Sequence, residues 1–394
     1  MKSTQSKKSI AGAIDALIIQ NVEKVIATGR LYRYDCSTPE ESEVSLLERD
    51  FAAFVGSKYA VAVNSCSSAI FLSLICSGVK PGDKVLIPAF TFLAVPSAVV
   101  HAGAVPVLVE INDNYSLNTD DLKKMIARDT RYLLLSYMRG HVPNLDEVIS
   151  ICSRNGIMLI EDCAHSLGVD WDGIPTGRFG TAGCFSMQSY KIIDGGEGGI
   201  LVTDDEEVSA KAILYAGSYE RLWTRHFDTS SHLARLQKSI PAYNFRMSNL
   251  TASVVRPQLT LIRDRIKKYN DNYIHLTKIL SRSPHIHFPA RERKASLVAD
   301  SVQFNLQGLT REQMLTFGRS CKERGVNIEI FGLSQDNARC YWNWDFLGQT
   351  RDLPATRKIL ESACDMRLRL FLTEEDITAM GAVILESIEY AKAL

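Results

Sequence analysis

The most informative stretch of the chain is Cys184-Phe-Ser-Met-Gln-Ser-Tyr-Lys191-Ile-Ile-Asp-Gly-Gly-Glu-Gly-Gly199. It places one lysine between an apolar, hydroxyl-bearing run and a turn that contains four glycines. A chain usually turns inward at such a point, so the amine of Lys191 is a candidate nucleophile toward a carbonyl group. Glycine adopts backbone dihedral angles that other residues avoid, and it has no side chain. We therefore expect these glycines to shape the turn and to let a neighbouring backbone segment approach closely.

An acid precedes this stretch at the end of a predicted strand, in Ile157-Met-Leu-Ile-Glu-Asp162-Cys-Ala-His165. A pyridoxal phosphate site requires a lysine for the Schiff base and a carboxylate against the ring nitrogen of the cofactor. Asp162 and Lys191 meet both requirements. Asp162 could equally cap a helix, and His165 could be a hydrogen-bonded core histidine.

Strand and helix patterns alternate around these residues, which predicts an α/β fold with a mainly parallel central sheet flanked by helices. We expect strands at 59–64, 84–88, 105–109, 131–136, 157–161 and 200–203, with helices near 67–77, 97, 118–127, 145–155 and 211. Linkers rich in glycine and proline separate them.

The flanking regions follow other patterns. A helix is expected over 10–28, and Thr38-Pro39-Glu40-Glu41 predicts a capped helix start. Residues 218–242 look like a long irregular loop, and a helical stretch is expected over 249–282. The pattern from Ser301 onward, with strands at 302–306 and 326–330, a helix at 311–324 and closing helices from Thr373, predicts a smaller C-terminal α+β domain. We therefore divide the chain into a large domain, 1–250, with an N-terminal helical segment, and a small domain, 251–394.

Composition excludes several classes of protein. The 394 residues include 45 Lys and Arg against 45 Asp and Glu, so charge gives no case for nucleic acid or for an anionic membrane. Nine cysteines without close pairs indicate reduced thiols in a cytoplasmic protein, and no metal site is predicted. The basic start, Met1 to Ser9, lacks the apolar region of a secretory signal. The uncharged stretch Val85 to Val109 is long enough for a membrane span, but its prolines favour strand–helix–strand.

Two more motifs follow predicted strands. Asn64-Ser65-Cys66-Ser67-Ser68 opens a helix, whose N–H groups and hydroxyls would receive a phosphate, although such turns are mostly simple caps. Pro88-Ala-Phe90-Thr91-Phe92 carries aromatic rings that could stack on a flat heterocycle or pack in the core. Ligands of open α/β sheets bind at the carboxyl ends of strands, where all these motifs fall.

Together the motifs resemble one family. The runs Asn64 to Ser68, Phe90 to Phe92, Glu161 to His165, Phe185-Ser186, Lys191, Gly196 to Gly199 and Tyr243-Asn-Phe-Arg-Met-Ser248 resemble the DegT/DnrJ/EryC1/StrS aminotransferases, collinearly from about Gly29 onward. The resemblance implies the pyridoxal phosphate-dependent transferase fold type I, that of aspartate aminotransferase. It also implies transfer of an amino group from an amino acid, most often glutamate or glutamine, to a keto-sugar or related carbonyl compound in polysaccharide or antibiotic biosynthesis.

The resemblance assigns roles to single residues. Lys191 would form the Schiff base with the cofactor, Asp162 would pair with the pyridinium nitrogen, His165 would contact the phenolic oxygen, and Phe92 would stack on the ring. The remaining residues that it assigns to the cofactor would hold the phosphate or reach into the neighbouring subunit of a homodimer with shared active sites. They are Ser67, Ser68 and Ser186 for the phosphate, and Asn244 and Arg246 for the neighbouring site.

The chain departs from the family pattern where relatives contact their substrates. Examples are Cys66, the run Leu135-Ser-Tyr-Met-Arg139-Gly-His141, and the small-domain segments Phe331 to Gln335 and Tyr341-Trp-Asn-Trp344. Three arginines are candidates for a substrate carboxylate or phosphate, because guanidinium groups bind such anions bidentately, although most surface arginines have no such role. They are Arg139, Arg221 and Arg225. Two alternative functions stay open: a dehydratase of the same family, in which histidine often replaces the lysine, and a non-catalytic cofactor-binding sensor.

Overall fold

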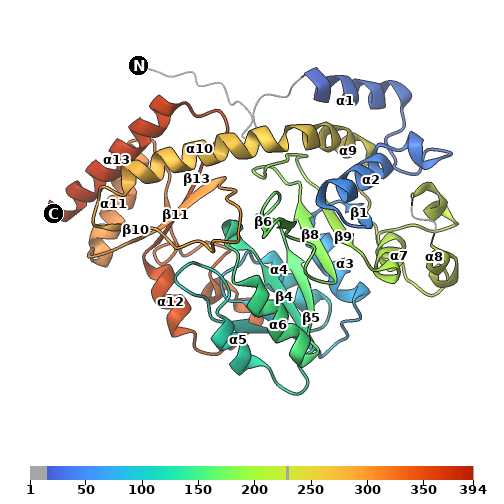
Figure 1. Ribbon diagram of the computed structural model, residues 1–394, viewed down its shortest axis with the longest axis horizontal. Helices are drawn as coiled ribbons and strands as arrows, with labels where there is room; N and C mark the ends of the chain where they lie inside the picture. Colours follow the sequence, from blue (N-terminus) through green and yellow to red (C-terminus); the bar gives the residue numbers. More distant parts are fainter. Residues whose placement is uncertain (1–15, 228–229, 394) are drawn as a thin grey trace.

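The computed structural model describes residues 16–227 and 230–393 (Figure 1). The large sheet is built from β1 (Tyr59–Val63), β2 (Lys84–Pro88), β3 (Val105–Val109), β4 (Tyr132–Ser136), β5 (Met158–Asp162), β8 (Ala182–Ser186) and β9 (Gly199–Thr203). Its strand order is β1-β9-β8-β5-β4-β2-β3. Neighbours from β3 to β8 are parallel, whereas β9 is antiparallel to both β1 and β8. The predicted mainly parallel α/β sheet is confirmed.

Both faces of this sheet are covered, because consecutive residues of its strands point to opposite sides and both sets are apolar. In β4, for example, Leu133 and Leu135 pack in one apolar core and Leu134 in the other. One core includes residues of α2 (Glu43–Val55), α5 (Thr119–Met125) and α6 (Leu145–Asn155). The other includes residues of α3 (Cys66–Cys76), α4 (Ala94–His101) and α7 (Glu206–Tyr215).

A second sheet lies in the C-terminal part of the chain. It is antiparallel, with the order β10-β11-β13-β12. Its strands are β10 (Ile286–His287), β11 (Ser301–Leu306), β12 (Glu329–Ile330) and β13 (Ala363–Arg367). The helices of this part are α10 (Ile262–Leu280), α11 (Arg311–Glu323), α12 (Pro354–Glu361) and α13 (Glu374–Ala393). In Figure 1, α10 extends along one side of the molecule and links the two parts. The boundary at residue 250 stays a prediction.

The N-terminal region corrects one prediction. The described part of the opening helix is α1 (Ala16–Thr28). Residues 10–15 and the basic start, Met1 to Ser9, lie outside the described residues. The helix start at Thr38 is wrong. Its hydroxyl makes no capping bond, and Pro39–Glu41 form a 3-10 turn. Helix α2 begins at Glu43, because the Ser42 hydroxyl accepts a hydrogen bond from the Ser45 N–H.

Residues 218–242 are less irregular than predicted, because they contain a 3-10 turn, Leu222–Arg225, and the helix α8 (Ser231–Leu236). The predicted helical stretch from 249 consists of α9 (Asn249–Val255), a 3-10 segment and α10. Two short strands, β6 (Asp170–Trp171) and β7 (Ile174–Pro175), form a hairpin. The uncharged stretch folds as β2, α4 and β3, as predicted. Among the described helices, none has both the length and the apolar character that crossing a membrane requires.

Candidate active site

A cavity of about 1450 Å³ opens at the carboxyl ends of the large-sheet strands and extends toward the small sheet. Parallel strands bring their carboxyl ends to one edge, so residues far apart in sequence meet there. The cavity brings together six of the predicted site residues: Ser67, Phe92, Asp162, His165, Ser186 and Lys191. Ser68, Asn244 and Arg246 are not part of its lining.

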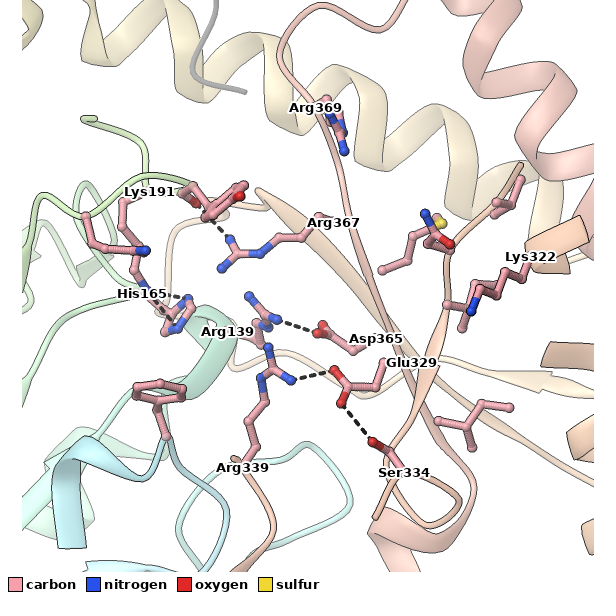
Figure 2. Close-up of a pocket in the computed structure, with 18 of the residues that line it drawn as sticks. Arg139, His165, Lys191, Lys322, Glu329, Ser334, Arg339, Asp365, Arg367 and Arg369 are labelled. Atoms are coloured by element: carbon pink, nitrogen blue, oxygen red, sulfur yellow. Dashed lines mark hydrogen bonds and ion pairs between the residues drawn. The ribbon is translucent and has the colours of Figure 1, made fainter. Parts of the chain in front are cut away.

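Lys191 lies on the loop after β8, in a tight turn whose preceding residue, Tyr190, has a φ of 81°. Its Nζ lies 2.9 Å from Nε2 of His165 (Figure 2). Burial, together with the nearby cations of Arg367 and Arg139, lowers the pKa of Lys191 to about 7. Burial, followed by the nearby Lys191, holds the pKa of His165 well below its ordinary value. Near neutral pH a large share of Lys191 therefore has a neutral, reactive amine, which a lysine of ordinary pKa would lack.

Asp162 ends β5 and is buried. Its Oδ2 accepts a hydrogen bond from the Ser136 hydroxyl at 2.7 Å, and its Oδ1 accepts one from the Ala164 N–H at 3.1 Å. Burial raises its pKa, and the bond from Ser136 offsets part of that rise. A buried carboxylate without a cation is unfavourable, so this site favours a positively charged partner.

The neighbouring acid, Glu161, has a different role. It is completely buried, and its carboxylate accepts bonds from the Tyr137 hydroxyl and from the backbone N–H groups of Gly177, Phe179 and Gly180. Four donors satisfy this carboxylate, which ties the 177–180 turn to β5. Glu161 is therefore a structural residue, whereas Asp162 faces the cavity.

The serine turn lies at the N-terminus of α3. Ser65 caps the helix by accepting a bond from the Ser68 N–H, and the Ser68 hydroxyl donates to Oδ1 of Asn64 at 2.7 Å. The Ser67 side chain stays exposed on the cavity wall. A Cβ at Gly199 would lie 2.3 Å from the Ser65 carbonyl oxygen, so the glycine turn and the serine turn are packed against each other. The expected close backbone approach at these glycines is confirmed.

The two aromatic residues after β2 differ in environment. Phe90 is 1% exposed and packs in a small apolar core. Phe92 is 44% exposed and lines the cavity. The core alternative therefore applies to Phe90, and Phe92 presents its ring to the cavity.

Asn244 and Arg246 lie elsewhere. Asn244 is exposed, and Arg246 donates a bond to the Gly217 carbonyl oxygen and lies over the rings of Tyr32 and Tyr219. Of the three candidate arginines, Arg139 lines the cavity, whereas Arg221 and Arg225 do not.

Sequence reasoning missed several cavity residues. Arg339 and Arg367 lie beside Arg139 on the side of the cavity that faces Asp365 and Glu329 (Figure 2). Arg367 belongs to β13, which was not predicted as a strand. From Cys364 to Arg367 the strand alternates apolar and polar residues, and this short alternation was the signal in the sequence that could have predicted it. Ser136, the partner of Asp162, was identifiable as the last residue of its strand.

Comparison with known proteins agrees with this geometry. Residues 13–384 match the DegT/DnrJ/EryC1/StrS aminotransferase family. The chain belongs to this family. The enzyme is thus an aminotransferase, the class that depends on pyridoxal phosphate.

Individual relatives are distant. The chain is 27% identical over 370 residues to the spore coat polysaccharide biosynthesis protein SpsC of Bacillus subtilis, covering 91% of each chain. It is 35% identical over 196 residues to L-glutamine:scyllo-inosose aminotransferase of Streptomyces griseus, covering 49% of this chain and 46% of the relative. The crystal structure of 3-amino-5-hydroxybenzoic acid synthase has a TM-score of 0.83 at 24% identity, covering 95% of this chain and 97% of the other, which confirms the fold.

Proposed function

We propose that this DegT/DnrJ/EryC1/StrS family member moves an amino group from an amino acid, glutamate or glutamine, to a keto-sugar or related carbonyl acceptor, with pyridoxal phosphate held at Lys191. One observation carries the proposal: the same cavity holds a lysine with a pKa of about 7 and a buried aspartate with a raised pKa. The first suits a neutral nucleophile and the second suits a cationic partner.

The residues present fit this cofactor. Asp162 would hold the protonated ring nitrogen, which would supply the positive charge that its buried carboxylate lacks. Phe92 would cover one face of the ring. Ser67 and Ser186 would bind the phosphate together with N–H groups at the start of α3. When bound, the cofactor would supply an electron sink for the substrate carbon.

Lys191 would also move the proton of the reaction. With a pKa near 7 its amine can accept a proton from the substrate carbon and return it at a second position. His165, 2.9 Å away, would orient the amine. The first role follows from the lowered pKa of Lys191 and the second from the contact between the two side chains.

The names of the relatives support the substrates. The matched Streptomyces griseus enzyme is named for L-glutamine as donor and scyllo-inosose, a cyclic keto compound, as acceptor. GDP-perosamine synthase of Caulobacter vibrioides, 31% identical over 225 residues, is named for an amino-sugar product. These names support a polar, hydroxylated carbonyl acceptor for this chain.

A homodimer with shared sites is part of the proposal. Asn244 and Arg246 do not line the cavity of their own chain, and Tyr32, Tyr219 and Tyr243 around them expose large parts of their rings. Such a polar and aromatic surface is typical of a subunit contact. Reaching into a neighbouring cavity would give both residues the roles that the resemblance implies.

Borohydride trapping tests the function. Purified protein mixed with pyridoxal phosphate should turn yellow, and reduction should attach a pyridoxyl group to the peptide that contains Lys191. Lys191→Ala should lose both colour and label, and Lys267→Ala, on an exposed part of α10, should keep them. An unchanged label in Lys191→Ala would overturn the assignment. A labelled protein that no amino acid bleaches would instead be a sensor.

A further inference from the structure

The residues on either side of Lys191 are held by arginines from the C-terminal part of the chain. Nη1 of Arg367, in β13, donates a hydrogen bond to the carbonyl oxygen of Tyr190 at 3.0 Å. Nη1 of Arg265, in α10, donates one to the carbonyl oxygen of Ile192 at 2.8 Å. The lysine therefore lies between two contacts that reach its backbone from other elements of the fold.

Arg367 is anchored by Asp300, which is buried. Its Nη1 pairs with Oδ2 of Asp300 at 2.5 Å. The register of the small sheet fixes this pair, because Ser301 in β11 lies opposite Arg367 and the Leu368 N–H donates to the Asp300 carbonyl oxygen at 2.9 Å. The Ser301 hydroxyl donates to the other carboxylate oxygen of Asp300 at 3.0 Å. Asp300 therefore holds the guanidinium group of Arg367 against the Lys191 turn.

Arg265 is anchored by Gln258. Its Nη1 donates to Oε1 of Gln258 at 2.6 Å, and both residues are buried. The Gln258 amide also binds the backbone of Asp194, because its Oε1 accepts from the Asp194 N–H and its Nε2 donates to the Asp194 carbonyl oxygen. Arg265 and Gln258 therefore hold the backbone from Ile192 to Asp194, directly after Lys191.

The turn at Tyr190 needs such support. Tyr190 has a φ of 81°, a backbone conformation that residues other than glycine seldom adopt. Such conformations persist only where surrounding contacts hold them, and they occur often at active sites. The backbone at this turn sets the direction in which the Lys191 side chain enters the cavity. A loosened turn would let the amine move away from Nε2 of His165, from which it lies 2.9 Å.

We propose that Asp300, Arg367 and Arg265 are positioning residues for Lys191, which fix the backbone on both sides of the lysine and thereby the place of its amine. The proposal rests on the proposed function and adds the residues that orient the nucleophile. Asp300 and Arg265 are not part of the cavity lining, so they act through the backbone and not by contact with a substrate. A displaced reacting group can lower a rate about a hundredfold. Arg367 does line the cavity, in the arginine cluster Arg139, Arg339 and Arg367 (Figure 2).

The charges of Asp300 and Arg367 act on Lys191 with opposite signs. Burial is the largest cause of the lowered pKa of Lys191, the Arg367 cation adds to the lowering, and the Asp300 carboxylate opposes it. Removing the Asp300 charge should therefore lower the pKa of Lys191. A general loosening of the site would instead raise it toward the ordinary value, because the amine would meet more water. The other titratable groups that act on Lys191 are Arg139, Cys66, His165 and Asp162.

Acetylation of the cofactor-free protein by acetic anhydride tests the effect of Asp300. Asp300→Asn removes the charge and keeps an oxygen that can accept from Arg367, so the pH midpoint of Lys191 acetylation should fall by about half a unit, the effect of one partly screened charge. Asp204→Asn, which loses a carboxylate paired with Arg178 outside the cavity, should leave the midpoint unchanged. A midpoint that stays in place or rises in Asp300→Asn would overturn the proposal.

The half-reaction with an amino acid tests the geometry. Asp300→Ala and Arg265→Met each remove one anchor, and the limiting rate at which L-glutamate bleaches the cofactor-loaded enzyme should fall about tenfold or more in both. The half-saturating concentration of L-glutamate should change little, because neither residue meets the substrate. Asp300→Asn should restore most of the rate that Asp300→Ala loses, since its amide oxygen can still accept from Arg367.

These measurements separate the positioning role from the proposed function. Borohydride labelling of Lys191 in the parent tests the function. Parent rates in both Asp300→Ala and Arg265→Met, with that label present, would overturn the positioning role alone. Urea unfolding verifies that the variants are folded, and Asp300→Asn, which keeps its hydrogen bonds, still provides the midpoint test if Asp300→Ala does not fold.

Discussion

The Nζ of Lys191 lies 2.9 Å from Nε2 of His165, and both groups titrate below their ordinary range. Two bases in contact cannot both carry a proton without repulsion, and burial disfavours the charged form of each. The pKa of about 7 leaves a large share of the Lys191 amine neutral near pH 7, the state in which it can attack a carbonyl group.

The reactivity of Lys191 should follow this pKa. In the cofactor-free protein, acetylation of Lys191 by acetic anhydride should increase with pH and reach half of its maximum near pH 7, because the neutral amine is the reactive form. Arg367→Gln should move the midpoint upward, since the cation of Arg367 lowers the pKa of Lys191. Mass spectrometry of the peptide gives the profile, and exposed Lys267 is the internal reference. A midpoint near that of Lys267 would contradict the prediction.

Asp162→Asn should separate chemistry from stability. Asparagine can accept the Ala164 N–H with its oxygen and donate its NH₂ to the Ser136 hydroxyl, which can also accept, but it cannot stabilise a cationic ring nitrogen. Turnover should therefore fall about a hundredfold or more, the usual effect of removing a preorganised charge. The folded pKa of Asp162 is raised, so its contribution to stability is present at low pH and is lost as pH rises through that pKa. The variant resembles the protonated form and should be at least as stable as the parent at pH 7. Steady-state rates measure the turnover, and urea unfolding measures the free energy of unfolding. A variant that unfolds at lower urea concentration than the parent would refute the stability prediction.

Glu161→Gln should show the opposite pattern. The substitution leaves one oxygen where two accept four hydrogen bonds, and it points an NH₂ group at N–H donors. We expect a loss of about 3 kcal/mol in unfolding free energy, the range for breaking a buried charged network. The fraction that remains folded should keep the cofactor absorbance of the parent. A large fall in turnover per folded molecule would argue for a direct chemical role.

Gly199→Ala should disturb the packing of the glycine turn against the serine turn at the N-terminus of α3. The new Cβ would lie 2.3 Å from the Ser65 carbonyl oxygen, so one of the two turns must shift, at a cost of about 1–3 kcal/mol. Cofactor affinity should fall with stability, which fluorescence titration can follow. Gly318→Ala is the matched control. Gly318 lies within α11, where alanine favours the helix, and its new Cβ would lie at an ordinary contact distance of 3.6 Å from Ile330. Equal effects at both positions would exclude a specific link between the turns.

Subunit mixing should reveal the shared sites. Lys191→Ala should be inactive, and Asn244→Ala with Arg246→Ala should lose cofactor affinity. Mixed dimers of the two proteins would contain one site built only from unmodified residues, so activity should return on mixing. The absence of any recovery, with dimer exchange verified by mass spectrometry, would show that each chain completes its own site.

The parts of the fold and of the site that the sequence predicts are those marked by residues close by in the sequence. Strands β2 and β3 and helix α6 have their predicted bounds, because Gly, Pro and the Asn144 cap mark their ends within a few residues. The cavity residues of the large sheet were predictable for a similar reason, since each follows a strand end. Arg139 and Asp365 meet across 226 positions of sequence, and no local pattern reports such a pair. The arginine cluster therefore needed the structure.

Strand β13 connects two properties of the enzyme. Asp365 pairs with Arg139, and two residues later Arg367 bonds to Asp300 and donates to the Tyr190 carbonyl oxygen beside Lys191. The side chains of Asp365 and Arg367 lie on the same face of the strand, because they are two residues apart. A substitution of either one therefore changes the charge around the other. A substitution of Arg367, which lines the cavity, would therefore also change the pKa of Lys191, because the Arg367 cation lowers that pKa.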